Sequence, residues 1–599
     1  MRVGVDTGGT FTDVVAADGS IAKVPSTMAD PAAAVGEALA AVGGADVVAH
    51  GTTVATNAVL ERRGGRVALV ITAGFADVIE IGRQNRPSLY DPFADRPAPL
   101  VPRELRYEVG GRLDAGGAEI EALGPPPAIT AGVEAVAVCL LHSDLNAEHE
   151  RALAAVLRAE GHDVTCSSEI SPEFREYERT VTTVLNAYLR PPCRQYLDRL
   201  ADLAPEVVVM TSAAGLIPVD EAAERPVALM LSGPAGGVLA AAAAAAEAGF
   251  PDAVTFDMGG TSTDVCLVLD GRAAPAAQRR VGGFPLRLPS LDIHTIGAGG
   301  GSIAALDPGG ALRVGPRSAG AEPGPACYGR GGTEPTVTDA DLVCGRIPAD
   351  AAFPGLDRLD RAAAERALVG AGIDAEGVIA VVDEAMVQAV RSVSLARGSD
   401  PRRLALVAFG GAGPLHACAM AEALGMPAVV VPPRAGVLSA LGILTAPRQV
   451  DLVRSWPATA EVAGLDEALD DLAAQARHAL GVAGAGGEAE VEVEVAFDCR
   501  YAGQSHEITV AGLAGFPAEH ERRNGYARPG APVEVTALRA TARMASPVSL
   551  GDLPPPATSR GAASGPAVLS EPDCTVWVPE GWHAEVHASG SWVIRRGPP

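Results

Sequence analysis

The chain has 599 residues, of which 48% are hydrophobic and 20% charged, and its formal net charge is −26 at pH 7. This length exceeds what one hydrophobic core organises, so we expect about two to four domains in a protein of ordinary globular composition. The acidic balance argues against a nucleic-acid partner, which normally meets a basic face, but it does not exclude a nucleotide, because backbone N–H groups and Mg²⁺ can hold phosphates.

Three further features narrow the class of protein. Lys23 is the only lysine, and a P-loop needs a lysine after its glycines, so a Walker-type NTPase is excluded. The nine cysteines form no Cys-x-x-Cys pair, and the chain enters a strand directly at Arg2-Val-Gly-Val5, so a reducing, cytoplasmic location is expected. The most apolar stretch, residues 227–250, is interrupted by Ser232-Gly-Pro234 and predicts a loop and an Ala-rich helix, not a membrane span.

The first informative segment in the chain is repeated. Asp6-Thr-Gly-Gly-Thr-Phe-Thr-Asp13 recurs as Asp257-Met-Gly-Gly-Thr-Ser-Thr-Asp264, and both copies share the frame D-x-G-G-T-x-T-D. Apolar residues flank each copy, and each then reaches an Asp-Gly pair, at Asp18-Gly19 and at Asp270-Gly271. Because Asp-Gly between apolar runs is a strong hairpin signal, each copy predicts strand, glycine-rich turn, strand and hairpin.

The chemistry of this frame indicates two phosphate loops. The glycines let the backbone approach a phosphate, and successive N–H groups form an anion-binding nest. Asp6 and Asp257 end their strands facing the nest, where we expect them to hold Mg²⁺ through its waters. Asp13 and Asp264 join them as candidate catalytic residues, although each would equally well cap its own loop. The predicted phosphate-binding residues are Gly8, Gly9, Thr10, Thr12, Gly259, Gly260, Thr261 and Thr263.

A polar segment and a presumed insertion follow the first loop. The segment His50-Gly-Thr-Thr-Val-Ala-Thr-Asn57 either caps the helix after it or lines an acceptor pocket opposite the phosphate loops. Pro-rich stretches at residues 91–99 and 124–127 indicate loops of a cap-like insertion. Arg83 lies between the first loop and the first Pro-rich stretch. An arginine there suits a substrate that bears a carboxylate, although exposed arginines are commonly just solvated. The candidate substrate residues here are Thr52, Thr53, Asn57 and Arg83.

Two residues ahead of a glycine run extend this set. Asp292 and His294 precede residues 297–301, and with one residue between them they would share one face of a strand. We predict a substrate- or nucleotide-proximal role for both. A carboxylate and an imidazole so placed could instead bind a metal ion, and a structural histidine held by hydrogen bonds is the remaining alternative. Cys327, in Pro-Ala-Cys-Tyr-Gly, has no base beside it in sequence, which favours a buried structural cysteine over a nucleophile.

A third glycine-rich element follows the apolar run at residues 404–409 and opens a helix near Pro414. Strand, glycine turn and helix make a place for the ribose or base of a nucleotide, and close helix–strand packing is the alternative. With two phosphate loops upstream, we predict a nucleotide-binding role for Gly410, Gly411 and Gly413.

These three elements, in this order, resemble the sugar kinase, Hsp70 and actin superfamily. The resemblance implies an α/β fold in which two ribonuclease-H-like lobes, from an internal repeat, close around ATP. We expect lobe I with its insertion at residues 1–205 and lobe II at residues 206–450. Residues 451–599 are expected to form a C-terminal β-rich domain, because Val491-Glu-Val-Glu-Val-Ala-Phe497 alternates with period two.

Longer segments carry a narrower resemblance. They lie at residues 50–57, 72–77, 80–84, 173–180, 232–237, 292–302 and 320–329. Together they resemble the hydantoinase A / 5-oxoprolinase family, the ATP-using subunit or half of ATP-dependent cyclic-amide hydrolases. The match runs from residue 1 to about residue 451 and is looser and shorter afterwards, and no B half is present in this chain.

The family resemblance implies an enzyme. It implies a subunit that binds MgATP, with K⁺ as a further candidate ion, and phosphorylates the amide oxygen of a hydantoin or lactam. A separate B-type subunit would then complete ring opening in a hetero-oligomer. The family also includes subunits of ATP-dependent ketone carboxylases, so such a subunit is the first alternative. A nucleotide-driven, chaperone-like ATPase is an alternative of another class, and it would depend on a protein client and not on a small molecule.

Overall fold

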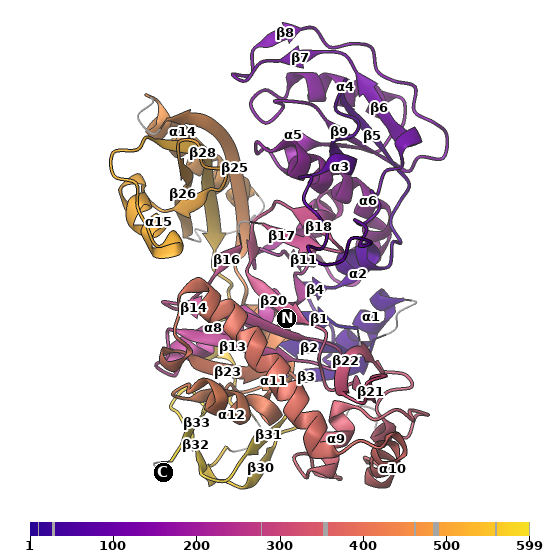
Figure 1. Cartoon of the computed structure of the whole chain (residues 1–599), viewed down its shortest axis with the longest axis vertical. Coiled ribbons are helices and arrows are strands. Elements are labelled where there is room, and N and C mark those ends of the chain that lie inside the picture. The colour runs from indigo at the N-terminus through magenta and orange to yellow at the C-terminus, as the bar shows by residue number, and fades with distance from the viewer. Residues whose placement is uncertain are drawn as a thin grey trace.

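The computed structural model describes residues 1–9, 11–26, 30–276, 278–351, 358–459, 463–482, 490–556 and 560–597. They form a mixed α/β protein, elongated in Figure 1, with the N-terminus near its middle. A small α/β unit lies at the top of that view, a β-rich unit at the upper left, and the second large sheet in the lower half.

The first large sheet contains the strands of the first copy of the repeat and segments from distant parts of the chain. The parallel pairing at the centre of this sheet, such as that of β1 with β4, is typical of Val-rich strands that are buried on both faces. In spatial order its strands are β27 (Ile508–Val510), β26 (Val491–Tyr501), β28 (Val533–Met544), β25 (Arg448–Thr459), β12 (Leu216–Pro218), β11 (Glu206–Met210), β4 (Val47–Thr52), β1 (Arg2–Thr7), β2 (Phe11–Ala16) and β3 (Ile21–Pro25).

The second large sheet repeats the arrangement of the first around its own hairpin. β13 pairs antiparallel with β14 and parallel with β23, as β1 does with β2 and β4. Its path is β15 (Arg272–Ala273), β14 (Thr263–Leu269), β13 (Ala253–Met258), β23 (Ala405–Phe409), β24 (Val429–Val431), β33 (Trp592–Arg596), β32 (Trp582–Val586) and β29 (Ala563–Ser564), with β20 (Ile293–Ile296) paired to β14.

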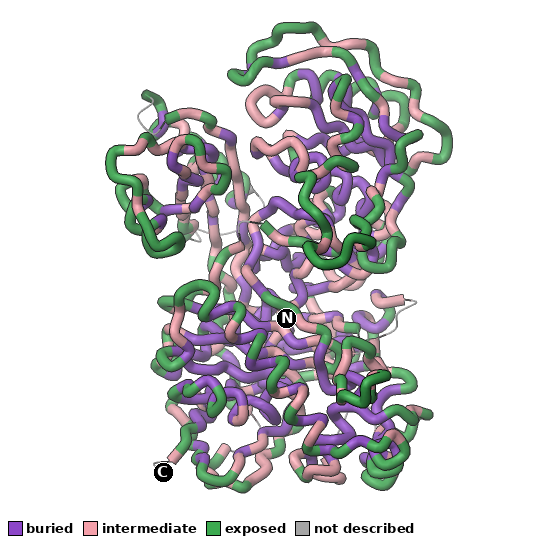
Figure 2. Tube along the Cα trace, in the orientation of Figure 1, coloured by how far each residue is buried: buried purple, intermediate pink, exposed green. Residues whose placement is uncertain are grey.

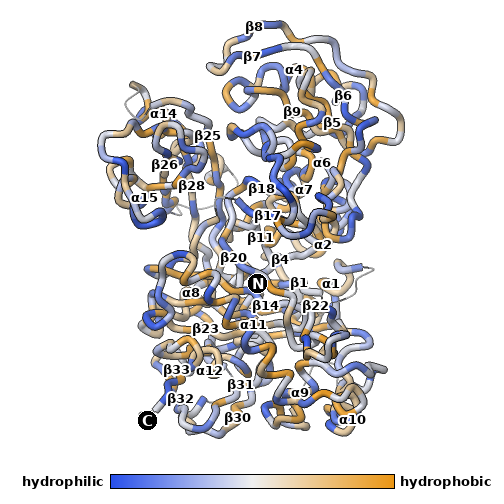
Figure 3. Tube along the Cα trace, in the orientation of Figure 1, coloured by the Kyte–Doolittle hydropathy of each residue, from blue (hydrophilic) through white to orange (hydrophobic). Residues whose placement is uncertain are grey.

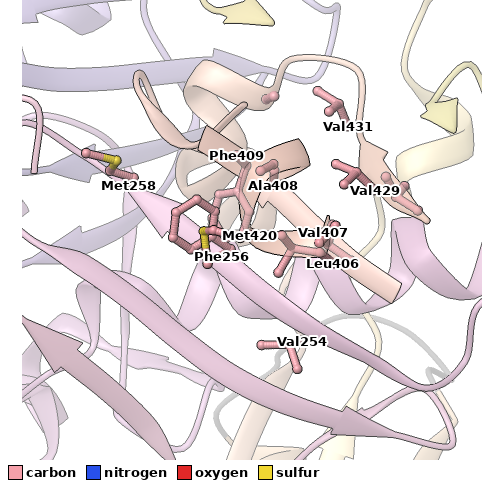
Figure 4. Close-up of a cluster of buried hydrophobic side chains, with 14 of the residues drawn as sticks. Val254, Phe256, Met258, Leu406, Val407, Ala408, Phe409, Met420, Val429 and Val431 are labelled. Atoms are coloured by element: carbon pink, nitrogen blue, oxygen red, sulfur yellow. The ribbon is translucent and has the colours of Figure 1, made fainter. Parts of the chain in front are cut away.

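Apolar side chains fill the space between this sheet and its helices. Phe256 and Phe409 are buried together with Met420 of α12 (Gly413–Leu424), and Figure 4 shows them side by side. On the same sheet, α11 (Ala375–Ser394) contributes a buried apolar face. Figure 2 shows the buried residues in the interior and the exposed ones along the outer edges, and Figure 3 shows apolar residues in many of the same interior segments, as expected for a core that excludes water.

Two helices connect the sheets by close backbone contact. A β-carbon on Gly442 of α13 (Leu438–Thr445) would lie 1.8 Å from the carbonyl oxygen of Gly236 in α8 (Gly233–Glu247). A β-carbon on Gly4 of β1 would lie 2.2 Å from the carbonyl oxygen of Ala440 in α13. Only glycine permits these approaches, so α13 is packed directly between α8 and the first sheet.

The unit at the top of Figure 1 is built on a smaller sheet, in the region where we expected an insertion. Its helices are α3 (Val78–Ile81), α4 (Glu148–Ala159), α5 (Ser167–Ile170) and the long α6 (Glu176–Ala201), whose buried residues also pack on the first sheet. The strands of this sheet are β10 (Val164–Cys166), β9 (Ala135–Cys139), β5 (Val67–Thr72) and β6 (Arg106–Val109).

Sheet membership differs from the predicted domain boundaries at residues 205 and 451. β11 and β12, which follow residue 205, belong to the first sheet, and β29, β32 and β33 return to the second. In the chain between β12 and β29, α14 (Leu465–Val482) and α15 (Phe516–Asn524) pack on the strands that extend the first sheet. Alternating or apolar patterns predict strands, but partners far away in the chain are chosen by packing.

A buried ionic cluster joins the top unit to the β-rich unit. Glu173 Oε2 accepts from Arg287 Nε at 2.6 Å and from Arg539 Nη2 at 3.1 Å, and Arg539 Nη2 also donates to Asp498 Oδ2 at 2.7 Å. Glu173 and Asp498 are 1% and 2% exposed. We call these four residues the Glu173 cluster; its charges are paired, as buried charges must be.

None of the helices in the described parts of the chain combines the length and apolar character that crossing a membrane requires.

Candidate nucleotide site

The two repeated segments fold into the same turn. The N–H of Gly8 donates to the carbonyl of Phe11 at 3.0 Å, and the N–H of Gly259 donates to that of Ser262 at 3.1 Å. The following glycine of each copy is exposed, and a β-carbon on Gly9 would meet nothing within 4 Å. The predicted hairpins are therefore present, each with a glycine at an open tip.

Two pairs of carboxylates face each other across the hairpins. Asp6 is opposite Asp13 in the register of β1 and β2, and Asp257 is opposite Asp264 in that of β13 and β14. Like charges directly opposite in a sheet are unfavourable. Burial, and then the charge of Asp264, raise the pKa of Asp257 to about 7, and burial raises the pKa of Asp264 to about 6.

The two hairpins share one electrostatic environment. Burial raises the pKa of Asp6 well above its usual value, and the charges of Asp13, Asp257 and Asp264 add to this effect. A carboxylate on the first sheet thus responds to both carboxylates of the second hairpin. Mg²⁺ prefers carboxylate oxygens and water as ligands, so a site that concentrates four aspartates, with Asp6 and Asp257 at the strand ends, fits such an ion.

Residues on and just after β3 hold the first phosphate loop through an ion pair and hydrogen bonds. Lys23 Nζ lies 2.8 Å from Asp13 Oδ1, and Ser26 Oγ donates to the carbonyl of Gly8 at 2.8 Å. Ser26 Oγ also lies 3.1 Å from Thr12 Oγ1. Sequence reasoning missed both supports, although the position of a single lysine shortly after the first loop was a signal.

The glycine run at residues 297–301 supports the second phosphate loop. The N–H groups of Gly300 and Gly301 donate to the carbonyls of Gly259 and Gly260 at 3.0 and 2.7 Å. A β-carbon on Gly299 would lie 2.8 Å from the Gly259 and Gly260 backbone, so a larger residue does not fit. Because the carbonyls of Gly259 and Gly260 accept these bonds, the glycine run holds the turn in one orientation. The sequence did not reveal this role.

The predicted threonines divide into groups. Thr12 and Thr263 are fully buried, and Thr263 Oγ1 donates to the carbonyl of Ala298 at 2.6 Å. Their hydroxyls bond within the protein, which favours a role in holding the loops over the phosphate contacts that we predicted. Thr261 is exposed at the tip of its loop, and Thr10 lies outside the described residues.

The third glycine-rich element lies against the second carboxylate pair. Gly410 has a φ of +78°, and a β-carbon there would lie 2.4 Å from Asp257 Oδ1. The N–H of Ala412 donates to the carbonyl of Met258 at 3.0 Å, and a β-carbon on Gly413 would lie 3.3 Å from the carbonyl of Phe256. Gly411 has open space around it. The element therefore combines close strand packing with an open glycine beside Asp257.

The polar segment after β4 lies beside the first loop. Thr53 Oγ1 donates to the carbonyl of Thr7 at 3.5 Å and accepts from Asn57 Nδ2 at 3.3 Å. Thr52 Oγ1 accepts from the N–H of Val54 at 3.2 Å, just ahead of α2 (Val54–Leu60), but the N-cap residue Thr53 makes no capping bond through its side chain. Thr53 and Asn57, both half-buried, remain candidates for the acceptor pocket.

The other substrate candidates are bonded elsewhere. Arg83 Nε donates to Glu178 Oε1 at 2.9 Å, within the top unit. Asp292 is paired with Arg397, and His294 is exposed on β20 opposite Val265. These contacts do not bring Arg83, Asp292 and His294 together, although β20 does reach the site through another residue. Thr295 Oγ1 donates to Asp264 Oδ1 at 2.5 Å.

Cys327 has the structural character that we expected. It is fully buried, and its N–H donates to Asp339 Oδ1 at 2.7 Å. Burial, and then the charge of Asp339, raise the pKa of its thiol, so the reactive thiolate is disfavoured.

Comparison with known proteins places this site in a family. The hydantoinase/oxoprolinase model matches residues 179–451, and the model of the hydantoinase/oxoprolinase N-terminal region matches residues 2–161. Caprolactamase subunit alpha of Pseudomonas jessenii is 34% identical over 100% of this chain and 99% of its own length. The crystal structure of ATP-dependent caprolactamase from that organism matches with a TM-score of 0.85 and 32% identity, covering 100% of both chains.

Two other relatives each match about three quarters of this chain. The 5-oxoprolinase 1 of Arabidopsis thaliana is 34% identical over 74% of this chain, which spans 41% of that longer protein. The acetophenone carboxylase gamma subunit of Aromatoleum aromaticum is 34% identical over 74% of this chain and 67% of its own length. Both family models and a full-length relative agree, and the chain belongs to the hydantoinase/oxoprolinase family.

Proposed function

We propose that this chain is the ATP-dependent subunit of a cyclic-amide hydrolase and phosphorylates the amide oxygen of a lactam or hydantoin. The observation that carries the proposal is the meeting of two identical glycine turns and four aspartates at one site. The full-length likeness to caprolactamase subunit alpha supports a lactam as the class of substrate.

The reaction suits such a site. A lactam carbonyl resists water because the amide is resonance-stabilised, yet its oxygen is already nucleophilic. The oxygen attacks the γ-phosphorus of ATP, an O–P bond forms, the bond to the β–γ bridging oxygen breaks, and ADP leaves. Water then adds to the imidate-like carbon, and the C–N bond breaks to leave a free amine and an acyl phosphate. A second water hydrolyses the acyl phosphate to a carboxylate and inorganic phosphate. Such phosphoryl transfer depends mainly on positioning and charge stabilisation and needs no strong base.

The residues have corresponding roles in this proposal. At the tips of the two turns, the backbone N–H groups of Gly9 and Gly260 bind phosphate oxygens, and Gly410 to Gly413 lie near the ribose or base. Asp6 and Asp257 hold Mg²⁺, which would neutralise charge on the phosphates. Thr53 and Asn57 orient the acceptor amide beside the first loop, and a separate B-type subunit completes ring opening.

The likeness to an acetophenone carboxylase subunit favours a second candidate, in which the phosphorylated group belongs to a ketone enolate or bicarbonate. A coupled ATPase assay separates the two. The purified chain, alone and with its candidate partner subunit, is tested against caprolactam, 5-oxoproline, hydantoins and acetone-like ketones. Stimulation by a cyclic amide is expected, whereas stimulation by ketones alone would sink the hydrolase proposal.

Site variants complete the test. Asp6→Asn and Asp257→Asn should each lower ATP turnover by about 100-fold or more, as loss of a charge stabiliser does. Asp18→Asn, on the exposed turn between β2 and β3, is the matched control and should retain activity. Full activity in either site variant would show that the metal assignment is wrong.

A further inference from the structure

We propose that Lys23 is a positioning residue of the nucleotide site, which holds Asp13 in place and ties the first phosphate loop to the segment leading from the second sheet into α13. The inference deepens the proposed function and rests on it. Lys23 is the only lysine in the sequence, and it does not belong to a P-loop.

The first contact fixes Asp13 across the hairpin. Lys23 on β3 is directly opposite Asp13 on β2. Its Nζ lies 2.8 Å from Asp13 Oδ1 and 3.0 Å from Asp13 Oδ2, so both carboxylate oxygens face the ammonium. The side chains are 20% and 17% exposed, which shields the pair from solvent and makes it stronger than a surface ion pair.

The second contact reaches across to the other half of the molecule. Lys23 Nζ donates to the carbonyl of Gly436 at 3.3 Å, in the turn η6 (Ala435–Val437) between β24 and α13. The N–H of Gly436 donates to Asp573 Oδ2 at 2.8 Å, and a β-carbon on Gly436 would lie 1.8 Å from the carbonyl oxygen of Asp573. Because this peptide is held on both sides, it is a firm anchor for the ammonium.

The charge of Lys23 acts on both hairpins. It lowers the pKa of Asp6 and Asp13 on the first sheet and of Asp257 on the second, against the effect of burial. Burial disfavours ionisation of these aspartates, and a bound divalent cation would favour it; when all four are ionised, the ammonium of Lys23 offsets one of the four negative charges. Lys23 therefore reduces repulsion among the aspartates without removing the demand for a metal ion.

This arrangement differs from that of a P-loop lysine. There the ammonium reaches the β and γ phosphates of the nucleotide. Here the ammonium faces a carboxylate of the protein and acts through it, so its removal should release Asp13 and leave the nucleotide turns intact.

The single lysine allows a chemical test on the full-length protein with Mg·ADP and with ATP plus a stimulating cyclic amide. Its only primary amines are Lys23 and the N-terminal amine, which is paired with Asp46. Reductive dimethylation keeps the positive charge and should preserve most ATP turnover. Acetylation removes the charge and should lower kcat about tenfold or more, and Mg·ADP should protect against it. The Lys23→Arg variant, whose only amine is the N-terminal one, should be insensitive to acetylation.

Variants separate positioning from a merely structural role. Lys23→Met should lower kcat at least as much as acetylation, and Lys23→Arg should restore part of the loss. Mg·ADP binding, measured by calorimetry, should weaken similarly in Lys23→Met, Asp13→Asn and the double variant, because the two residues act as one unit. Additive losses in the double variant, or turnover within threefold of wild type in Lys23→Met, would overturn the proposal.

The binding cycle also distinguishes this proposal from the proposed function. If no cyclic amide stimulates ATP turnover, the hydrolase proposal fails, but the Mg·ADP cycle still tests the pairing of Lys23 with Asp13. A wild-type chain that binds no Mg·ADP would overturn both.

Discussion

Gly410 and Asp257 are in direct contact: a β-carbon on the glycine would lie 2.4 Å from Asp257 Oδ1 and 2.6 Å from the carbonyl oxygen of Met258. The N–H of Gly410 donates to the carbonyl of Ala435 at 2.9 Å, so the glycine has no room to retreat. The third glycine-rich element is therefore part of the surroundings of the metal-binding candidate Asp257.

The first prediction concerns this contact. Gly410→Ala must place alanine at a φ of +78°, which costs about 1 kcal/mol, and its methyl group must displace Asp257. We expect ATP turnover and Mg²⁺ affinity to fall about tenfold or more, since small displacements of positioned groups cost that much. Gly372→Ala is the matched control: its φ is +68°, but nothing lies within 4 Å of its β-carbon. Equal losses in the two variants would attribute the effect to backbone strain alone.

The second prediction concerns pH and Mg²⁺. The pKa of Asp257 is raised to about 7 by burial and then by Asp264, so the metal-binding form gains population as pH rises from about 6 to 8. Mg²⁺ binding should tighten over this interval and release protons, which calorimetry in buffers of different ionisation enthalpy can count. Asp257→Asn should lose the pH dependence attributed to this group.

The Asp257 carboxyl should affect the stability of the fold in the opposite direction: higher pH favours Mg²⁺ binding but lowers the free energy of unfolding. Because its folded-state pKa is raised, its contribution to the free energy of unfolding is greatest at low pH and is lost as pH rises through about 7. In EDTA, the difference in stability between wild type and Asp257→Asn should therefore become less favourable to wild type from pH 5 to 8. Added Mg²⁺ should reverse that trend for wild type, and a flat difference would contradict the assignment.

The third prediction concerns a buried histidine on α12. His416 Nδ1 lies 2.7 Å from Asp383 Oδ1 on α11, and Nε2 lies 3.3 Å from Asp341 Oδ2 on α9 (Val337–Val343). Burial alone would lower its pKa, but the charges of Asp341 and Asp383 outweigh burial and raise the pKa to about 10. His416→Leu removes the nearer cation beside the buried Asp341, leaving Arg346 Nη1 at 4.0 Å, and should lower the free energy of unfolding by about 3 kcal/mol or more.

The pH dependence of this variant has a defined direction. Since the pKa of His416 is raised on folding, its stabilising effect is complete below about pH 6.5 and is lost as pH rises through about 10. Urea unfolding at pH 6, 8 and 10 should show the gap between wild type and His416→Leu narrowing at the highest pH. The exposed His506→Gln is the control and should show no such trend.

The fourth prediction concerns the Glu173 cluster between the top unit and the β-rich unit. Glu173→Ala leaves the guanidinium groups of Arg287 and Arg539 without their shared carboxylate. We expect a loss of about 3 kcal/mol or more in the free energy of unfolding, and faster proteolysis between the units. Glu365→Ala breaks an exposed pair with Arg361 and should cost less than about 0.5 kcal/mol. Similar costs for both variants would show that the cluster does not hold the units together.

The repeat is the feature that the sequence predicted best. Two copies of D-x-G-G-T-x-T-D predicted two hairpins, and Gly8 and Gly259 make the same turn bond in both. Such turns follow from glycine conformation and hydrogen bonds within a few residues, so they are legible in the chain itself. The family resemblance, carried by other short segments of the chain, was confirmed by both family models.

The tertiary structure decided what surrounds those turns. Thr12 and Thr263 fit the frame of a phosphate loop, yet their hydroxyls meet Ser26 and Ala298. The glycines at residues 297–301 hold the second loop.

By itself, then, the sequence determined the two glycine turns, their aspartates and the family. Only the fold decided that Lys23 reaches the carbonyl of Gly436, that Gly410 abuts Asp257, and that β33 returns to the second sheet beside β24. The physical reason is range: backbone preferences act over a few residues, whereas these partners are set by the packing of segments distant in the chain.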